Sequence, residues 1–137
     1  LFLDVSTEDL RALRECLDKH PDKYVIIATH HPPVSIGCSW LDSHRIKIDA
    51  ELIGLLEDYP LVKGIVFGHI HQPIDVMFEG VRLLGAPSTC FQFSPNSTSF
   101  SIDRKPPGYR WLTLMDDGLL ETEVGRLKVH PYEIDTL

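Results

Sequence analysis

Two short apolar runs, each followed at once by histidines, are the feature that most limits how this chain can fold. Residues 24–28 (YVIIA) lead into Thr-His-His-Pro-Pro, and residues 61–67 (LVKGIVF) lead into Gly-His-Ile-His-Gln. Apolar runs of this length between turn residues are typical of strands buried on both faces of an α/β sheet. A helix is predicted between them, over about residues 47–58, so the strands should pair in parallel through a right-handed crossover.

The carboxyl ends of such strands are where open α/β sheets bind their ligands. Both groups of histidines follow those ends directly. We therefore expect the two groups to face each other at one edge of the sheet.

The rest of the chain predicts one more helix and two antiparallel hairpins. Ser6 precedes leucines spaced three and four residues apart, a pattern that indicates a capped amphipathic helix over about residues 7–19. Alternating apolar runs on either side of glycine-containing turns indicate the hairpins. Their predicted strands are residues 74–78 with 81–84, and 110–115 with 119–124.

Residues 88–108 have no hydrophobic period and are predicted to form a long loop. We assign residues 1–127 to one domain and residues 128–137 to a tail. The fold class expected from these elements is α/β, with a mixed sheet and β-hairpins toward the C-terminus.

Charge and composition exclude several classes of partner. The chain has 13 Lys and Arg against 20 Asp and Glu, a formal charge of −7, which repels nucleic acid and anionic membranes. Its longest apolar runs are six or seven residues, well below the roughly 18 that a membrane-spanning helix needs. Cys16, Cys38 and Cys90 are scattered and odd in number, which favours a reducing cytoplasm.

Four histidines, His30, His31, His69 and His71, lie at the two strand ends. Neutral imidazole is the commonest metal ligand, and a metal needs several such groups at one point. In extended backbone His69 and His71 would point the same way, holding one ion together or two ions separately, with Gly68 allowing a sharp turn. The alternative is that these are ordinary hydrogen-bonded histidines, and no Asp follows either strand to complete a hydrolytic site.

The two histidine motifs resemble the last two motifs of the calcineurin-like metallophosphoesterases. The stretches GCSWLDSH (residues 37–44) and PSTC (residues 87–90) are similar to the bacterial class III, or Icc-type, 3′,5′-cyclic AMP phosphodiesterases. The similarity extends from the first helix to about Leu127. It implies a four-layer α/β/β/α sandwich, of which this chain would be the C-terminal half.

The resemblance also implies a cofactor. His30 and His69 would be ligands of one metal ion and His71 a ligand of a second, with Mn or Fe expected and Zn as an alternative. The two ions of this family bind phosphodiester oxygens and supply the attacking hydroxide.

The same resemblance implies roles toward a cyclic nucleotide substrate. His31 would lie near the substrate, and His31 or His71 would protonate or orient the leaving 3′ oxygen to give the 5′ nucleotide. Asp42 and His44, soon after the first histidine motif, are the candidates for substrate binding.

The sequence departs from the family in its missing carboxylates. The first three family motifs are D-x-H, G-D and G-N-H, but this chain has no Gly-Asp pair and its only asparagine, Asn96, follows a proline. Its two D-x-H strings, at residues 18–20 and 42–44, do not follow an opening strand and are interpreted as coincidences.

These absences, with Leu at position 1, lead us to expect a fragment that is inactive alone and that dimerises or swaps elements through exposed apolar surface. A non-catalytic truncated module that binds metal or only associates is the alternative. A general phosphodiesterase or phosphatase of the same fold would differ only in substrate.

Overall fold

The computed structural model describes residues 5–47 and 50–129 of the chain. The helices are α1 (Thr7–Asp18), α2 (Ser39–Asp42) and α3 (Ala50–Asp58). The strands are β1 (Val25–Thr29), β2 (Val62–Phe67), β3 (Asp75–Phe78), β4 (Val81–Gly85), β5 (Gln92–Phe93), β6 (Ile102–Asp103), β7 (Gly108–Leu114) and β8 (Leu120–Arg126). Among the described residues, no helix has the length and apolarity that a bilayer crossing requires.

Helix α1 begins where its capping residue predicts. The Ser6 hydroxyl accepts a hydrogen bond from the Asp9 N–H at 3.1 Å, and the Asp9 carboxylate accepts one from the Ser6 N–H at 3.2 Å. This capping box satisfies two N–H groups that would otherwise lack partners. Leu10 and Leu17 then bury the apolar face of the helix in the core.

Four strands form a mixed sheet in the order β1-β2-β4-β3. The pairs β1–β2 and β2–β4 are parallel, and β3–β4 is antiparallel, so the predicted parallel pair and the first predicted hairpin are confirmed. Thr29 pairs with Phe67, the last residues of β1 and β2. The parallel strands β1 and β2 therefore end side by side, and the residues after them start from the same edge of the sheet.

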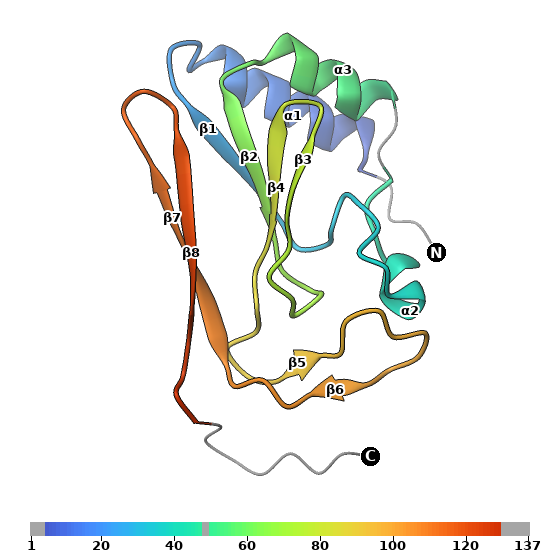
Figure 1. Ribbon diagram of the computed structural model, residues 1–137. Coiled ribbons are helices and arrows are strands. Elements are labelled where there is room, and N and C mark those ends of the chain that lie inside the picture. The colour runs from blue at the N-terminus through green and yellow to red at the C-terminus, as the bar shows by residue number, and fades with distance from the viewer. Residues whose placement is uncertain (1–4, 48–49, 130–137) are drawn as a thin grey trace.

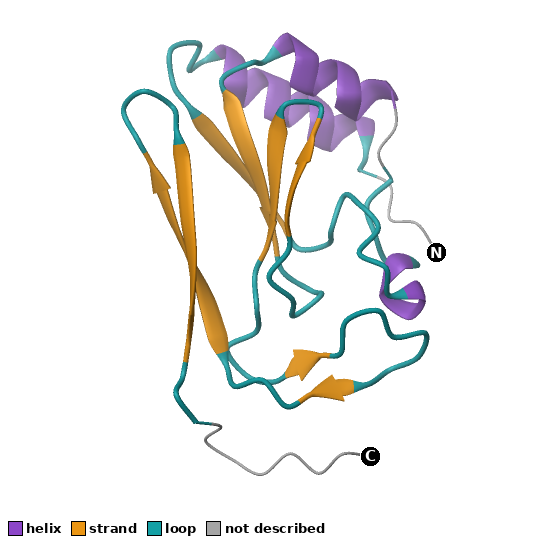
Figure 2. Cartoon of the chain, viewed as in Figure 1, coloured by secondary structure: helices purple, strands orange, loops and turns teal. Residues whose placement is uncertain are grey.

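The sheet is covered differently on its two faces (Figures 1 and 2). Helices α1 and α3 lie together behind it, and their leucines share one core cluster with Ile65 and Phe67 of β2. Gly64, on the opposite face of β2 from Ile65, packs against Leu120 of β8, where a Cβ on the glycine would lie 2.7 Å from Leu120 Cδ2. The β7–β8 hairpin thus lies against the face that the helices leave uncovered.

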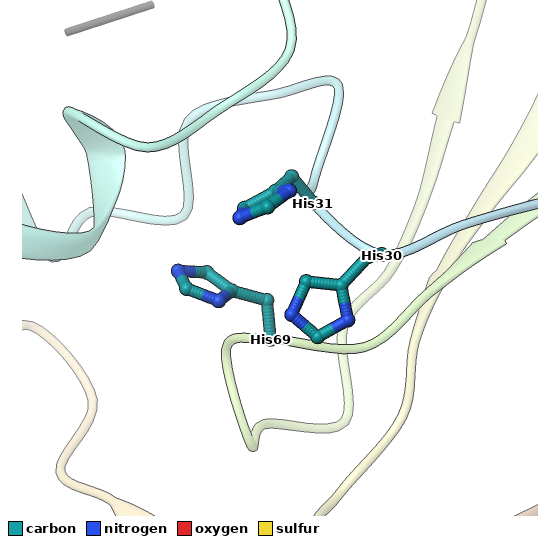
Figure 3. A group of neighbouring side chains, drawn as sticks. All are labelled: His30, His31 and His69. Carbon is teal, nitrogen blue, oxygen red and sulfur yellow. The ribbon is translucent and has the colours of Figure 1, made fainter. Parts of the chain in front are cut away.

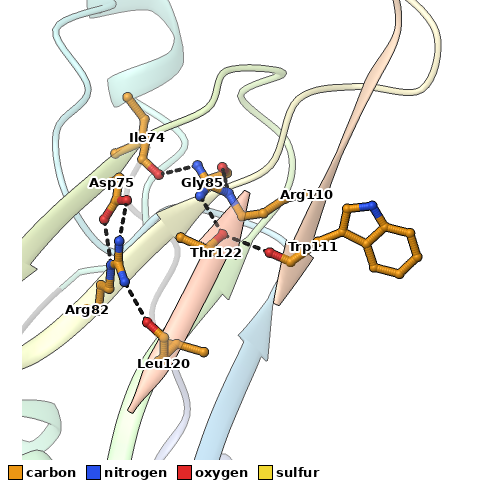
Figure 4. Close-up of polar contacts among 8 residues, drawn as sticks. All are labelled: Ile74, Asp75, Arg82, Gly85, Arg110, Trp111, Leu120 and Thr122. Carbon is orange, nitrogen blue, oxygen red and sulfur yellow. Dashed lines mark hydrogen bonds and ion pairs between the residues drawn. The ribbon is translucent and has the colours of Figure 1, made fainter. Parts of the chain in front are cut away.

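Two arginines attach this hairpin to the sheet (Figure 4). Arg110 of β7 donates hydrogen bonds of 2.9 Å to the carbonyls of Gly85 and Ile74 and to the Thr122 hydroxyl. Arg82 of β4 donates to both carboxylate oxygens of Asp75 and, at 2.6 Å, to the Leu120 carbonyl. These hydrogen bonds therefore connect the four-stranded sheet to the β7–β8 hairpin.

The segment 88–108 differs from the predicted loop. It contains the two-residue strands β5 and β6, in which Gln92 pairs with Asp103 and Phe93 with Ile102. A two-residue ladder is too short to leave a hydrophobic period in the sequence. The short helix α2 also lies in a stretch for which no element was predicted.

The second predicted hairpin is confirmed as β7–β8, with seven paired positions. Helix α3 starts at Ala50, and residues 48–49 of its predicted range lie outside the described part of the chain, as do residues 130–137 of the predicted tail. The α/β class, the mixed sheet and the C-terminal hairpins are thus confirmed. The four-layer sandwich remains an expectation drawn from the resemblance.

Candidate metal centre

The histidines after β1 and β2 meet at the edge of the sheet, as the sequence predicts. The paired strand ends place His30 and His31 beside the loop that carries His69. The Thr29 hydroxyl donates a 2.9 Å hydrogen bond to the His31 carbonyl, which holds the chain in its turn after β1. The two prolines after His31 then lead the chain away from the sheet.

Three of these histidines form a compact group (Figure 3). One ligand nitrogen from each of His30, His31 and His69 lies within 4.8 Å of the others. The ring centroids are 4.7 Å apart for His30 and His31, 5.2 Å for His30 and His69, and 4.4 Å for His31 and His69. His30 is exposed and the other two are partly buried, so the group opens to solvent.

The surroundings favour the neutral form of two of these imidazoles, those of His31 and His69. Burial, with the neighbouring histidines, lowers the pKa of His69 to about 4, and burial followed by His30 and His44 lowers the pKa of His31. Nε2 of His69 is buried and has no hydrogen-bond partner. A neutral imidazole with an unpartnered nitrogen has a lone pair available for a metal ion, so these residues suit one.

The backbone of the His69-Ile70-His71 segment is not extended, which corrects the predicted geometry. His69 has φ 60° and His71 has φ 53°, both in the left-handed region, while Ile70 between them is fully buried. Gly68 does not make the sharp turn, because a Cβ there would meet only ordinary contacts. The strain falls on the two histidines, and their rings leave the turn toward different neighbours.

His71 lies apart from the group of three. Its ring stacks on Phe93 at a centroid distance of 4.3 Å and an interplanar angle of 6°, and it contacts the edge of Phe91 at 5.2 Å. Burial lowers the pKa of His71, and this effect is larger than that of a hydrogen bond with the Phe91 backbone, which raises it. Its Nδ1 is buried without a partner, so His71 also has a nitrogen free to bind a ligand or a proton.

The two predicted substrate-binding residues occupy different positions. The His44 ring lies 5.5 Å from the His69 ring, beside the group of three. The Asp42 carboxylate instead accepts hydrogen bonds from the Ile36 N–H at 2.8 Å and the Ser35 hydroxyl at 2.7 Å. Asp42 therefore closes its own loop, and that loop presents His44.

The aromatic residues near the site pack on one another. The Trp40 ring makes edge-to-face contacts with Phe93 and Phe100, with ring centroids 4.9 Å and 5.6 Å apart. Phe93 also carries the stacked His71 ring, a role that sequence reasoning missed. No local signal identifies it, because β5 is two residues long and its partner His71 precedes it by a turn, two strands and a loop.

Comparison with known proteins gives relatives over nearly the whole chain. It is 41% identical over 128 residues to the 3′,5′-cyclic adenosine monophosphate phosphodiesterase CpdA of Pseudomonas aeruginosa, covering 93% of this chain and 47% of that protein. It is 44% identical over 124 residues to CpdA of Vibrio vulnificus, covering 90% and 45%. A 3′,5′-cyclic-nucleotide phosphodiesterase of Nostoc is 40% identical over 114 residues, covering 83% and 42%.

No protein-family model matches the chain. The chain spans about half the length of the curated relatives it matches. Identity of 36–44% over about 90% of this chain nevertheless recurs in the same proteins from several bacteria. The chain is therefore similar, over nearly its whole length, to about half of the bacterial CpdA-type cyclic AMP phosphodiesterases.

Proposed function

We propose that this chain carries the histidine part of a metal-dependent site that hydrolyses the phosphodiester of a 3′,5′-cyclic nucleotide. The observation that carries the proposal is the convergence of His30, His31 and His69 from two strand ends. The names of the relatives, which act on cyclic AMP or cyclic nucleotides, supply the substrate class. In the reaction, water adds across the bond between phosphorus and the 3′ oxygen, and the product is the 5′ nucleotide.

The residues that would hold metal are the histidines, with His30 and His69 on one ion and His71 on a second. Divalent ions bound in this way would polarise a phosphoryl oxygen and lower the pKa of water. Mn or Fe is expected and would also need carboxylate oxygen, whereas Zn, the alternative, would suit imidazole donors. Because the chain carries a formal charge of −7, a phosphate would meet a favourable field only where such ions reverse the local sign.

The proton for the leaving 3′ oxygen would come from His31 or His71. His71 Nδ1 has no partner, and it would take up or release a proton only where it does not bind the second ion. His44, presented next to His69, would contact the substrate, while Asp42 would act through the loop that it closes. The proton transfer and the substrate contacts would thus both occur at the edge of the sheet where β1 and β2 end.

We also propose that the 137-residue chain alone has little activity and works in the cytoplasm. Within the described residues no carboxylate joins the group of three histidines, although hydrolytic sites for Mn or Fe use carboxylate ligands. A cytoplasmic setting would keep its three cysteines as the thiols that they are here. The second candidate function, a metal-binding module without turnover, rests on the same missing carboxylates.

We further propose that the chain associates with a second copy. Large apolar side chains are exposed on the β7–β8 hairpin, including Trp111 at 62% and Leu119 at 56%. Exposed patches of this kind favour association. Light scattering that finds only monomers at high concentration would count against this.

The test is a comparison of substrates under Mn²⁺. Cyclic AMP and a phosphomonoester are offered to the 137-residue chain and to any longer polypeptide that its gene encodes. We expect the longer protein to hydrolyse cyclic AMP and the chain alone to be nearly inactive. A preference for the monoester would make the protein a phosphatase, and the absence of turnover in the longer protein would favour the binding module.

A further inference from the structure

We propose that Phe100 is the platform on which the base of the nucleotide stacks, beside the histidines at the edge of the sheet. The inference rests on the proposed function, and it narrows the substrate from a cyclic nucleotide to a purine nucleotide. The names of the relatives that include adenosine monophosphate supply the base to be tested. The structure adds the surface that such a base would contact.

Phe100 is a large apolar side chain left open to solvent in a polar loop. The six residues before it, 94–99 (SPNSTS), are serine, threonine, asparagine or proline, and 56% of Phe100 is exposed. Single exposed apolar residues are common on protein surfaces. An exposed ring that continues a group of other rings is instead typical of a ligand-binding surface.

A row of rings connects Phe100 to His71. The Phe100 ring makes edge-to-face contacts with Phe93 and Trp40, with centroids 5.7 Å and 5.6 Å apart. Phe93 in turn carries the stacked ring of His71, at 4.3 Å. Of these four rings, that of Phe100 is the one classed as exposed, and the others are partly buried. A nucleotide with its phosphate at the histidines would therefore find an open aromatic surface at Phe100.

The loop that presents Phe100 is held in place by hydrogen bonds. The Ser94 N–H donates to the Ser101 carbonyl at 2.8 Å, and the hydroxyls of these two serines lie 3.0 Å apart. The Ser39 hydroxyl donates to the Thr98 carbonyl at 3.3 Å, which ties the loop to α2. A ring that is positioned before binding loses little conformational freedom when a base stacks on it.

The segment that contains α2 contributes to both parts of this surface. Trp40 lies in α2 and contacts Phe100, and His44, shortly after α2, lies 5.5 Å from His69. One short segment thus borders the histidine group at one end and the row of rings at the other. This arrangement suits a ligand with a charged part and a flat apolar part.

Stacking on an aromatic side chain selects bases by the strength of the stacking. Every base has a π-face, so aromatic side chains stack on all of them, and preferences follow stacking strength. A purine has two fused rings and a pyrimidine has one. We therefore expect Phe100 to favour purine nucleotides over pyrimidine nucleotides.

The test is an NMR titration of the 137-residue chain with adenosine and with uridine. Neither nucleoside has a phosphate, so its binding requires neither metal nor turnover. The indole N–H of Trp40 reports on the row of rings, and that of Trp111, on the β7–β8 hairpin, is the internal control. Trp111→Phe assigns the two signals. We expect adenosine to shift the Trp40 signal and not the Trp111 signal, and to bind more tightly than uridine.

Substitutions at Phe100 then identify the platform. Phe100→Ala should weaken adenosine binding by about tenfold, as expected for the loss of one stacked contact with a base. Phe100→Tyr keeps the ring and should bind like the unmodified chain. Tyr109→Ala removes an exposed ring from the hairpin and, as the matched control, should leave adenosine binding unchanged. Circular dichroism confirms that each variant is folded.

The proposal is overturned if adenosine leaves the Trp40 signal unchanged, if its binding survives Phe100→Ala, or if uridine binds as tightly. These outcomes are separate from that of the hydrolysis assay. Hydrolysis of cyclic AMP by the longer protein without adenosine binding at Trp40 would keep the proposed function and remove the platform. Adenosine binding that depends on Phe100, without hydrolysis, would keep the platform and remove the proposed reaction.

Discussion

The molecule has two clusters of polar side chains that differ in whether their polar atoms have partners. In the Arg82–Arg110 network, each guanidinium donates to carbonyl, hydroxyl or carboxylate oxygens of the chain itself (Figure 4). At the group formed by His30, His31 and His69 (Figure 3), Nε2 of His69 is buried with no partner. Nδ1 of His71, in the same loop, is also buried with no partner.

A buried polar group without a partner costs free energy of folding, so folds normally satisfy such groups. The satisfied network joins a sheet to a hairpin and serves stability. The unsatisfied group lies at the ligand-binding edge of the sheet and is complete only with something from outside. We therefore expect large stability effects from substitutions at the first cluster and small ones at the second.

The largest effect is expected from Arg110→Met. The substitution removes hydrogen bonds to the carbonyls of Gly85 and Ile74 and to the Thr122 hydroxyl, and it takes away the contacts that join β7 to the sheet. We expect the free energy of unfolding to fall by about 3 kcal/mol, measured by urea denaturation. Arg104→Met, which removes the same charge from an exposed loop position, should change it little. Equal effects of the two substitutions would remove the distinction between the clusters.

A smaller effect is expected from Asp75→Asn. Arg82 holds the pKa of Asp75 below its usual 3.8, chiefly by hydrogen bonding. The ion pair therefore stabilises the protein fully above that value, and the contribution is lost as the pH falls through the folded-state pKa. We expect a loss of about 1 kcal/mol at pH 7, because both side chains are partly exposed, and a smaller difference from the unmodified chain at pH 3.

The matched control is Asp22→Asn, which removes a carboxylate whose contact with Lys23 is more exposed. It should change the urea midpoint less than Asp75→Asn at pH 7. A difference between Asp75→Asn and the unmodified chain that grows on acidification would contradict a stabilising ion pair between Asp75 and Arg82.

The smallest effect at neutral pH is expected from His69→Gln in chelator-treated protein, because Nε2 of His69 has no hydrogen bond to lose. The effect appears on acidification. Since the pKa of His69 is about 4 in the folded state against 6.5 ordinarily, the unfolded chain binds the proton first. The contribution of His69 to the free energy of unfolding is therefore fully present above pH 6.5 and is lost as the pH falls toward 4. The His69→Gln variant should lose less stability over this range.

Melting temperatures between about pH 7.5 and 4.5, on either side of the ordinary histidine pKa, measure this, with His20→Gln at an exposed position as the control. If His69→Gln lowers the stability at neutral pH as much as Arg110→Met does, the histidine group is a structural cluster.

Much of the site can be predicted from local sequence, because short apolar runs mark the strands and the positions where they end. The runs at residues 24–28 and 61–67 place His30 and His69 at one edge, and the paired strand ends confirm it. The separation of His71 from His69 could not be predicted, since it depends on left-handed backbone at two histidines and on stacking with Phe93. Arg110 is similar, because its acceptors lie 25 and 36 residues away in sequence.

Whether the histidine group is built for an external ligand can be tested by anomalous X-ray diffraction at the zinc absorption edge, from crystals of the chain grown with Zn²⁺. We predict an anomalous peak at the histidine group, bonded to His30 and His69. Diffraction that shows no zinc at these residues would contradict this assignment.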